Sequence, residues 1–174
     1  KELLLRAVGE YPHNLGEGKL ESGQENNLYY LLGLVQEKLG EAKDAFESLT
    51  RACCGESEPV GMMYYNDQPP EMIYYQGLAY RMLGEEEQAV RRFQKLVDYG
   101  REHIRDDVKI DYFAVSLPDL LIFEENLNER NRKHCLFMMS LGLKGLGRID
   151  EAEKCAEELL AMDNAHQEIR VHDL

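Results

Sequence analysis

The stretch YYQGLAYRMLGEEEQAVRRFQKLV, residues 74–97, carries the pattern that decides the fold. A small residue, Gly77, is followed seven positions later by Gly84 and five positions after that by Ala89. Apolar residues recur at helical spacing on both sides of Gly84, which predicts two helices joined by a glycine turn. Small residues at the crossing points allow the two helices to lie close together.

The same order of residues occurs twice more in the chain, which indicates an internal repeat. The repeated sets are Gly33, Gly40 and Ala45, and then Ser140, Gly147 and Ala152. Each set predicts one helical hairpin. Hairpins that stack on one another bury a shared core, so the expected fold is all-α, a right-handed superhelix of antiparallel helix pairs with two long inserts.

The hairpins have predicted boundaries. The first pairs helices 26–39 and 41–52, the second pairs 70–83 with 86–99 capped by Gly100, and the third pairs 128–146 with 150–162. The second helix of each pair is expected to face inward through apolar side chains. These are Ala42, Ala45, Phe46, Leu49 and Ala52, then Ala89, Val90, Phe93, Leu96 and Val97, then Ala152, Cys155, Ala156, Leu159 and Leu160.

We expect a single domain over residues 1–174. Its parts are the tail of a preceding repeat (1–14), repeats at 26–54, 70–100 and 128–163, and an insert at 101–127. A further insert spans 55–70, and the apolar content of both inserts predicts that they pack on the repeats. Ser116 and Pro118 predict a short helix that ends near Phe123. The chain begins in a helical pattern, which suggests a piece of a longer polypeptide.

Composition excludes several functional classes. The net charge is -13, from 20 Lys and Arg against 33 Asp and Glu, and such a charge disfavours nucleic acid and anionic lipid surfaces. No apolar run is long enough to span a membrane. The four cysteines lack C-x-x-C spacing, which favours reduced thiols and a cytoplasmic location.

The pattern resembles the tetratricopeptide repeat. The second unit is the closest match, through Gly77, Tyr80, Gly84, Ala89 and Phe93. The first unit matches through Tyr29, Leu32, Gly33, Gly40, Ala45, Leu49 and Ala52; the third matches more loosely through Leu136, Met139, Ser140, Leu143, Gly147, Ala152, Ala156 and Leu159. The resemblance implies a non-catalytic, protein-binding scaffold.

Two longer stretches extend the resemblance. YYNDQPPEMIYYQGLAYRMLG (64–84) and DYFAVSLPDLLIFEENLNERNRKHC (111–135) look like the C-terminal repeat region of large bacterial proteins. Those proteins carry an N-terminal β-sandwich domain of uncharacterised function, similar to galactose-mutarotase-like carbohydrate-active domains. This resemblance implies a cytoplasmic bacterial protein whose sugar-handling part, if any, lies upstream.

A ligand stripe follows from helical spacing in the first helix of each hairpin. Three times, a polar residue is followed by an aromatic residue, a leucine and a charged residue. The stripe comprises Asn27, Tyr30, Leu34 and Glu37; Glu71, Tyr74, Leu78 and Arg81; and His134, Phe137, Leu141 and Lys144. Such aromatics either line a groove that binds a peptide or a sugar face, or pack against adjacent helices. Tyr65 and Asn66, in the first insert, are candidates to complete the groove.

The sequence offers little support for a catalytic site or a metal site. Asp106, Asp107 and Asp111 lack the glycine-pivoted loop of a calcium site, and the five histidines do not form a recognisable catalytic set. No cofactor is expected. The leading hypothesis is a scaffold that docks a protein segment, such as the upstream domain of the same polypeptide. The alternatives are a homodimer formed through helix 149–162 and a carbohydrate-binding helical domain.

Overall fold

The computed structural model describes residues 1–9, 23–61, 67–109 and 126–172. These residues form helices and no strand, and the fold is an all-α, tetratricopeptide-like superhelix. The helices are α1 (Glu2–Gly9), α2 (Asn26–Lys38), α3 (Ala42–Ala52), α4 (Pro70–Met82), α5 (Glu86–His103), α6 (Leu127–Gly145), α7 (Ile149–Met162) and α8 (Gln167–Val171).

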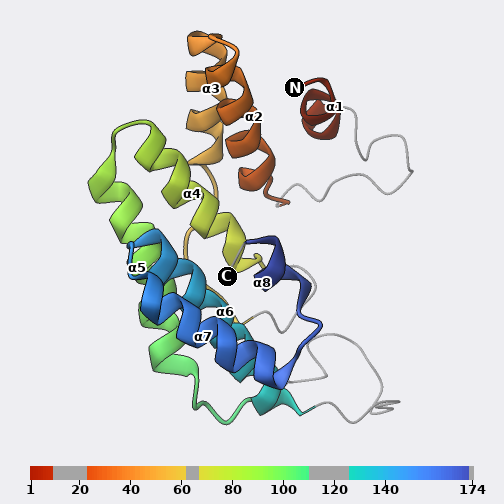
Figure 1. Ribbon diagram of the computed structural model, residues 1–174, viewed down its shortest axis with the longest axis vertical. Helices are drawn as coiled ribbons and strands as arrows, with labels where there is room; N and C mark the ends of the chain where they lie inside the picture. Colours follow the sequence, from red (N-terminus) through yellow and green to blue (C-terminus); the bar gives the residue numbers. More distant parts are fainter. Residues whose placement is uncertain (10–22, 62–66, 110–125, 173–174) are drawn as a thin grey trace.

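Three hairpins stack from α2–α3 through α4–α5 to α6–α7, while α1 packs on α2 (Figure 1). The predicted pairs of helices are therefore confirmed, with boundaries within a few residues of those expected. The short helix α8 has no counterpart in the sequence analysis.

The three turn glycines adopt the left-handed conformation that glycine allows. Gly40, Gly84 and Gly147 have φ values of 77°, 81° and 75°. After each of them the next amide reaches back to a helix carbonyl. The donors and acceptors are Glu41 N to Gln36 O, Glu85 N to Tyr80 O, and Arg148 N to Leu143 O, each at 2.9 Å. This is the Schellman geometry, which pairs helix-end carbonyls and ends the helix at a defined residue.

Close helix crossings depend on the predicted small residues. A Cβ atom on Gly33 would lie 2.7 Å from Leu49 Cγ, and one on Gly77 would lie 2.4 Å from the Phe93 ring. Ser140, the third member of the set, is fully buried. Phe93 also reaches the next hairpin, since a Cβ atom on Gly145 would lie 2.2 Å from its ring. One side chain thus joins two repeats.

Three sequence predictions for the second helices were wrong. Phe46 and Val90, which occupy equivalent positions in their repeats, were expected to face inward but are 62% and 39% exposed. Ala42 is exposed as well. Phe46 and Val90 each follow an inward-facing alanine by one residue, and one step along a helix rotates a side chain by about 100°. The neighbouring helices cover only the alanine side.

Gly100 does not cap the helix as expected. Helix α5 continues to His103, and Gly100 lies buried inside it, where a Cβ atom would be 2.8 Å from the carbonyl oxygen of Cys135. The glycine therefore permits a close approach between α5 and α6, and it does not end the helix.

The described part of the first insert packs on the hairpins, as predicted. The Gln76 side chain donates to the carbonyls of Cys54 (3.1 Å) and Glu56 (2.8 Å), and Lys95 pairs with Glu58. His134 bonds the Val60 carbonyl at 2.8 Å. The proposed helix at 116–123 lies outside the described residues. All four cysteines are free of disulfide bonds.

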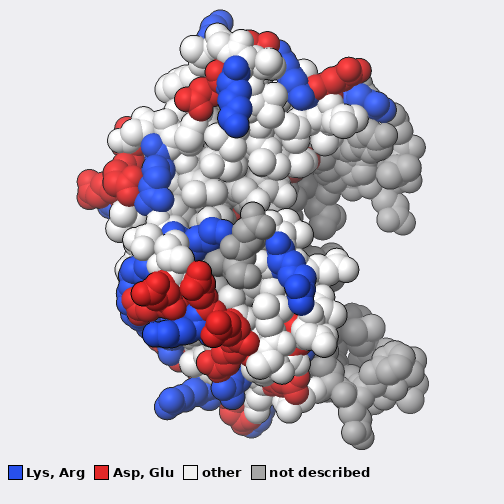
Figure 2. Space-filling model, viewed as in Figure 1, with Lys and Arg blue, Asp and Glu red and all other residues white. Residues whose placement is uncertain are grey.

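Charged side chains gather in patches on the surface. Acidic groups cluster over α7 in Figure 2, where Glu151, Glu153, Glu157 and Glu158 are exposed. Among the described residues, none of the helices combines the length and the apolar character needed to cross a bilayer.

Candidate functional site

Aromatic side chains from three first helices come together at one face. Tyr30 of α2 lies 5.5 Å from Tyr75 of α4, measured between ring centroids, and Tyr75 lies 5.8 Å from Tyr74. Phe137 of α6 continues the set, and its ring lies 5.9 Å from that of His172. We call Tyr30, Tyr74, Tyr75 and Phe137 the aromatic face. Helical spacing brings Tyr30, Tyr74 and Phe137 to this side because they occupy equivalent positions in successive repeats.

Burial within the aromatic face is uneven. Tyr74 and Phe137 are 7% and 3% exposed, whereas Tyr30 and Tyr75 are half-buried. Burial raises the pKa of the Tyr74 hydroxyl to about 12 and also raises the pKa of Tyr30 and Tyr75. The three tyrosines are therefore neutral at physiological pH, and Tyr30 and Tyr75 are the members of the aromatic face that expose part of their rings.

Helix α8 covers part of the aromatic face. It lies beside the first turns of α4 and beside α6 in Figure 1. The imidazole of His172, just after α8, lies 6.0 Å from Tyr74 and 5.7 Å from Tyr75. Lys144 of α6 donates to the main-chain carbonyl of His172. The predicted stripe is thus occupied in its α4–α6 half by a segment of the chain itself.

The remaining stripe residues divide into rim and interior. Glu37 and Arg81 are exposed, Asn27, Leu34, Leu78 and Glu71 are partly buried, and Leu141 is fully buried. The Arg81 guanidinium pairs with Glu86 at 2.8 Å and lies 5.0 Å from the Phe93 ring centroid. Tyr65 and Asn66 lie outside the described residues.

His134 has an internal partner. A carbonyl oxygen only accepts, so Nε2 of His134 must carry the proton that bonds the Val60 oxygen. Burial lowers the pKa of this histidine, and the bond to Val60 opposes the shift. His134 holds the first insert against α6.

Gln76 is the residue that sequence reasoning missed. Its side chain is fully buried, donates to the carbonyls of Cys54, just before the first insert, and of Glu56 within it, and accepts from Arg92 Nε at 3.1 Å. The sequence signal that could have identified it is the presence of a glutamine directly before Gly77, on the packed side of a helix. A buried polar side chain at such a position needs hydrogen-bond partners.

The Glu71 carboxyl lies in a setting that disfavours its charged form. It lies in the first turn of α4, where the helix dipole favours a carboxylate, but burial dominates and raises its pKa. His172 lowers this pKa and Glu168 of α8 raises it. The carboxylate is therefore poorly solvated under α8.

The pKa of Glu71 predicts a stabilising substitution. A folded-state pKa above the unfolded value gives stability that is complete below the unfolded pKa, about 4.3, and is lost as the pH rises through the folded pKa. We expect Glu71→Gln to raise the free energy of unfolding at pH 7 and to leave it unchanged near pH 3.5. Urea unfolding at both pH values measures this difference. The exposed Glu153→Gln serves as the control, and equal effects of both substitutions would contradict the assignment.

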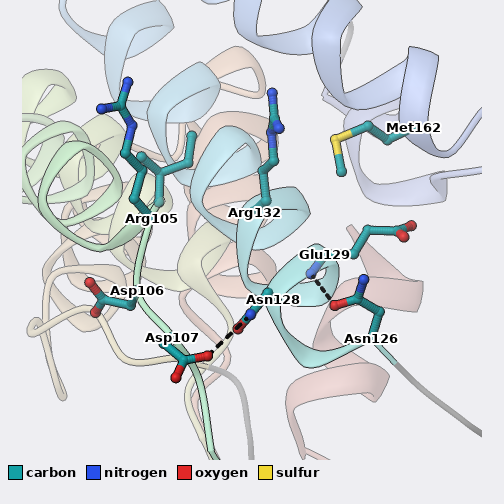
Figure 3. A pocket seen from close by; sticks show the side chains of 9 residues that line it. Arg105, Asp106, Asp107, Asn126, Asn128, Glu129, Arg132 and Met162 are labelled. Carbon is teal, nitrogen blue, oxygen red and sulfur yellow. Dashed lines mark hydrogen bonds between the residues drawn. The ribbon is translucent and has the colours of Figure 1, made fainter.

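A concavity lies at the N-terminal end of α6, away from the aromatic face. It has a volume of about 730 Å³ and is lined by Ile104, Arg105, Asp106, Asp107, Asn126, Asn128, Glu129, Arg132 and Met162. In Figure 3, the side-chain amide of Asn128 donates to the Asp107 carboxylate, and the Asn126 side chain accepts from the main-chain amide of Glu129 at 3.2 Å. Arg132 pairs with Glu158 at 2.5 Å. Most charged groups of this concavity pair with neighbours outside its lining: Asp106 with His103, Asp107 with Lys109, and Glu129 with Lys133. This pairing fits a structural role for the polar surface.

One hairpin of the chain matches a known protein family. Residues 71–99 match the tetratricopeptide repeat family model, a span that covers most of the α4–α5 hairpin. No solved structure matches the chain. The match and the helical stack support a tetratricopeptide repeat protein, a class that generally mediates protein–protein interactions and is typically non-catalytic. The galactose-mutarotase-like connection has no support beyond the sequence resemblance.

Proposed function

We propose that this chain is a non-catalytic scaffold that binds a protein segment at the aromatic face. The observation that carries the proposal is the convergence of Tyr30, Tyr75, Tyr74 and Phe137 from three helices. Tyr30 and Tyr75 are half-buried, whereas Tyr74 and Phe137 are buried against His172. Tyrosine and phenylalanine offer large contact areas with few rotors to immobilise, as protein-binding surfaces require.

The rim of the aromatic face fits a peptide better than a uniformly charged ligand. Glu37 and Glu71 contribute negative charge, while Arg81 and Lys144 contribute positive charge. Charges of both signs around apolar rings suit a partner with a mixed polar edge, since complementary charges set its orientation. Asn27, His134 and the insert residues Tyr65 and Asn66 complete the proposed binding set.

The partner that we propose is a protein segment, including the upstream domain of the same polypeptide. The resemblance to bacterial proteins with a β-sandwich domain supports this choice and a carbohydrate-related context. The four unbridged cysteines are compatible with the proposed cytoplasmic location.

Self-association through α7 is the less favoured alternative. Glu151, Glu153, Glu157 and Glu158 are exposed on this helix. Pairing of two α7 helices would place like charges opposite one another, which is repulsive.

A selection experiment tests the proposed function. Peptides selected from a random display library on the full chain are expected to bind with a Kd in the micromolar range, about -8 kcal/mol. Tyr30→Ala is expected to weaken this binding at least tenfold, about 1.4 kcal/mol, because it removes the half-exposed ring of the aromatic face. Fluorescence polarisation measures the affinities.

Lys43→Ala on α3 is the matched surface control, since the Lys43 side chain is 88% exposed. It is expected to leave peptide affinity unchanged. Peptides that bind the Tyr30→Ala chain as tightly as the wild type would exclude the aromatic face as the binding surface.

A further inference from the structure

Helix α8 meets the aromatic face through a short list of anchors. Ile169 is fully buried and belongs to the main core cluster, together with Tyr74 and Phe137. Three residues later, the His172 ring contacts Tyr74, Tyr75 and Phe137. Residues three apart lie on the same side of a helix, so both anchors point into one surface.

Lys144 supplies a third anchor of a different kind. By donating to the carbonyl of His172, it satisfies one of the acceptors left open at the end of a helix. A lysine at this place also complements the negative end of the helix dipole. The α4–α6 half of the aromatic face is therefore built to hold the last turn of a short helix.

Helix α8 buries few of its residues compared with the helices of the three hairpins. Ile169 is the single buried residue of its five, and Val171 is 73% exposed. Its first turn is capped by the His166 imidazole, which accepts from the Ile169 amide at 3.3 Å. A helix of this length has little stability of its own, so its docking depends on the anchors.

We infer that the segment bound by this scaffold is itself a short helix, which presents an aliphatic residue and, three positions later, an aromatic ring, and which displaces α8 from the aromatic face. The inference rests on the proposed function and specifies the partner. It assigns α8 the role of an internal competitor that raises the concentration of partner needed for binding.

The His172 ring docks less well than an apolar aromatic ring would. Its Nδ1 donates to the Glu168 carbonyl at 2.7 Å, so in the neutral ring Nε2 is an acceptor. Nε2 is buried, and within the described parts of the chain it has no hydrogen-bond partner. A buried polar atom without a partner weakens docking, so a phenyl ring at this position is preferred.

A synthetic peptide of residues 163–172, with blocked ends, is the probe. Ile169→Asp in the full chain places a charge where the buried anchor sits and releases α8. We expect this variant to bind the peptide at least tenfold more tightly than the wild type, in which tethered α8 competes at an effective concentration on the order of millimolar. A peptide carrying His172→Phe is expected to bind the variant at least threefold more tightly than the natural sequence.

Two further full-chain variants keep the test decisive. His172→Ala removes a half-buried anchor and is expected to give intermediate peptide affinity, even where Ile169→Asp proves unfolded by circular dichroism. Val171→Ala, at the neighbouring exposed position, is expected to behave as the wild type. Absence of peptide binding to both anchor variants, or equal binding to all four chains, overturns the inference.

The two proposals fail separately. If library-selected peptides bind through Tyr30 but the 163–172 peptide binds none of the variants, the scaffold function stands and the helical partner is wrong. If neither kind of peptide binds, both proposals are wrong.

Discussion

Phe93→Ala is expected to lower the free energy of unfolding by about 3–5 kcal/mol, the range for a fully buried phenylalanine. The ring is completely inaccessible and fills the space left by Gly77 on α4 and by Gly145 on α6. Because the residues that approach the ring most closely are glycines, neither of these two positions has a side chain that can move into the void. The loss therefore includes a cavity contribution as well as the lost apolar burial.

Urea unfolding followed by circular dichroism measures this loss. Phe46→Ala is a matched control, since it makes the same chemical change on the second helix of the preceding repeat at a position that is 62% exposed. We expect the control to change stability by less than about 1 kcal/mol. Losses of similar size at the two positions would mean that Phe93 does not join the second and third hairpins.

Gln76→Leu is expected to destabilise the chain by about 1–3 kcal/mol despite a similar side-chain volume. The substitution removes one of two side-chain donors to each of the carbonyls of Cys54 and Glu56, which Asn26 and Gln68 still reach, and it removes the acceptor of Arg92. The loss of hydrogen bonds made by a fully buried amide costs about this much. Hydrogen exchange provides a second readout. The main-chain amides of the described insert residues 55–61 are expected to exchange faster once the Gln76 side chain no longer holds the insert.

Gln94→Leu on α5 makes the same change at a more exposed glutamine, whose amide donates to Asp98 at 2.7 Å. The expected change there is within about 0.5 kcal/mol, as for ordinary surface positions. Retention of full stability and insert protection in Gln76→Leu would show that the insert is held by Lys95 and His134 without the glutamine.

The hairpins could be predicted because their determinants are local. Each turn needs a residue that tolerates positive φ, and Gly40, Gly84 and Gly147 stand at the required place seven residues after a small helix residue. Helical periodicity then placed Tyr30, Tyr74 and Phe137 at equivalent positions of successive first helices. The binding roles of these residues, and of the other proposed site residues, remain predictions.

Errors arose where a residue's environment depends on distant segments. Phe46 and Val90 are apolar and close to the helix side that packs, and only the position of the neighbouring helices reveals that they are exposed. Gly100 resembles a helix end by its residue type, yet the approach of α6 gives it a different role within α5. In both cases the deciding neighbour belongs to another helix.

The helical pairs, their turns and the spacing that aligns aromatic residues could be predicted from the sequence, because each follows from residues that lie near one another along the chain. The contacts by which Gln76 and His134 hold the insert, and the position of α8 on the aromatic face, emerge from the stacking of the hairpins. Those contacts join residues far apart in the chain, such as Val60 with His134 and Tyr74 with His172. Their pairing depends on how the hairpins stack, which no local pattern encodes.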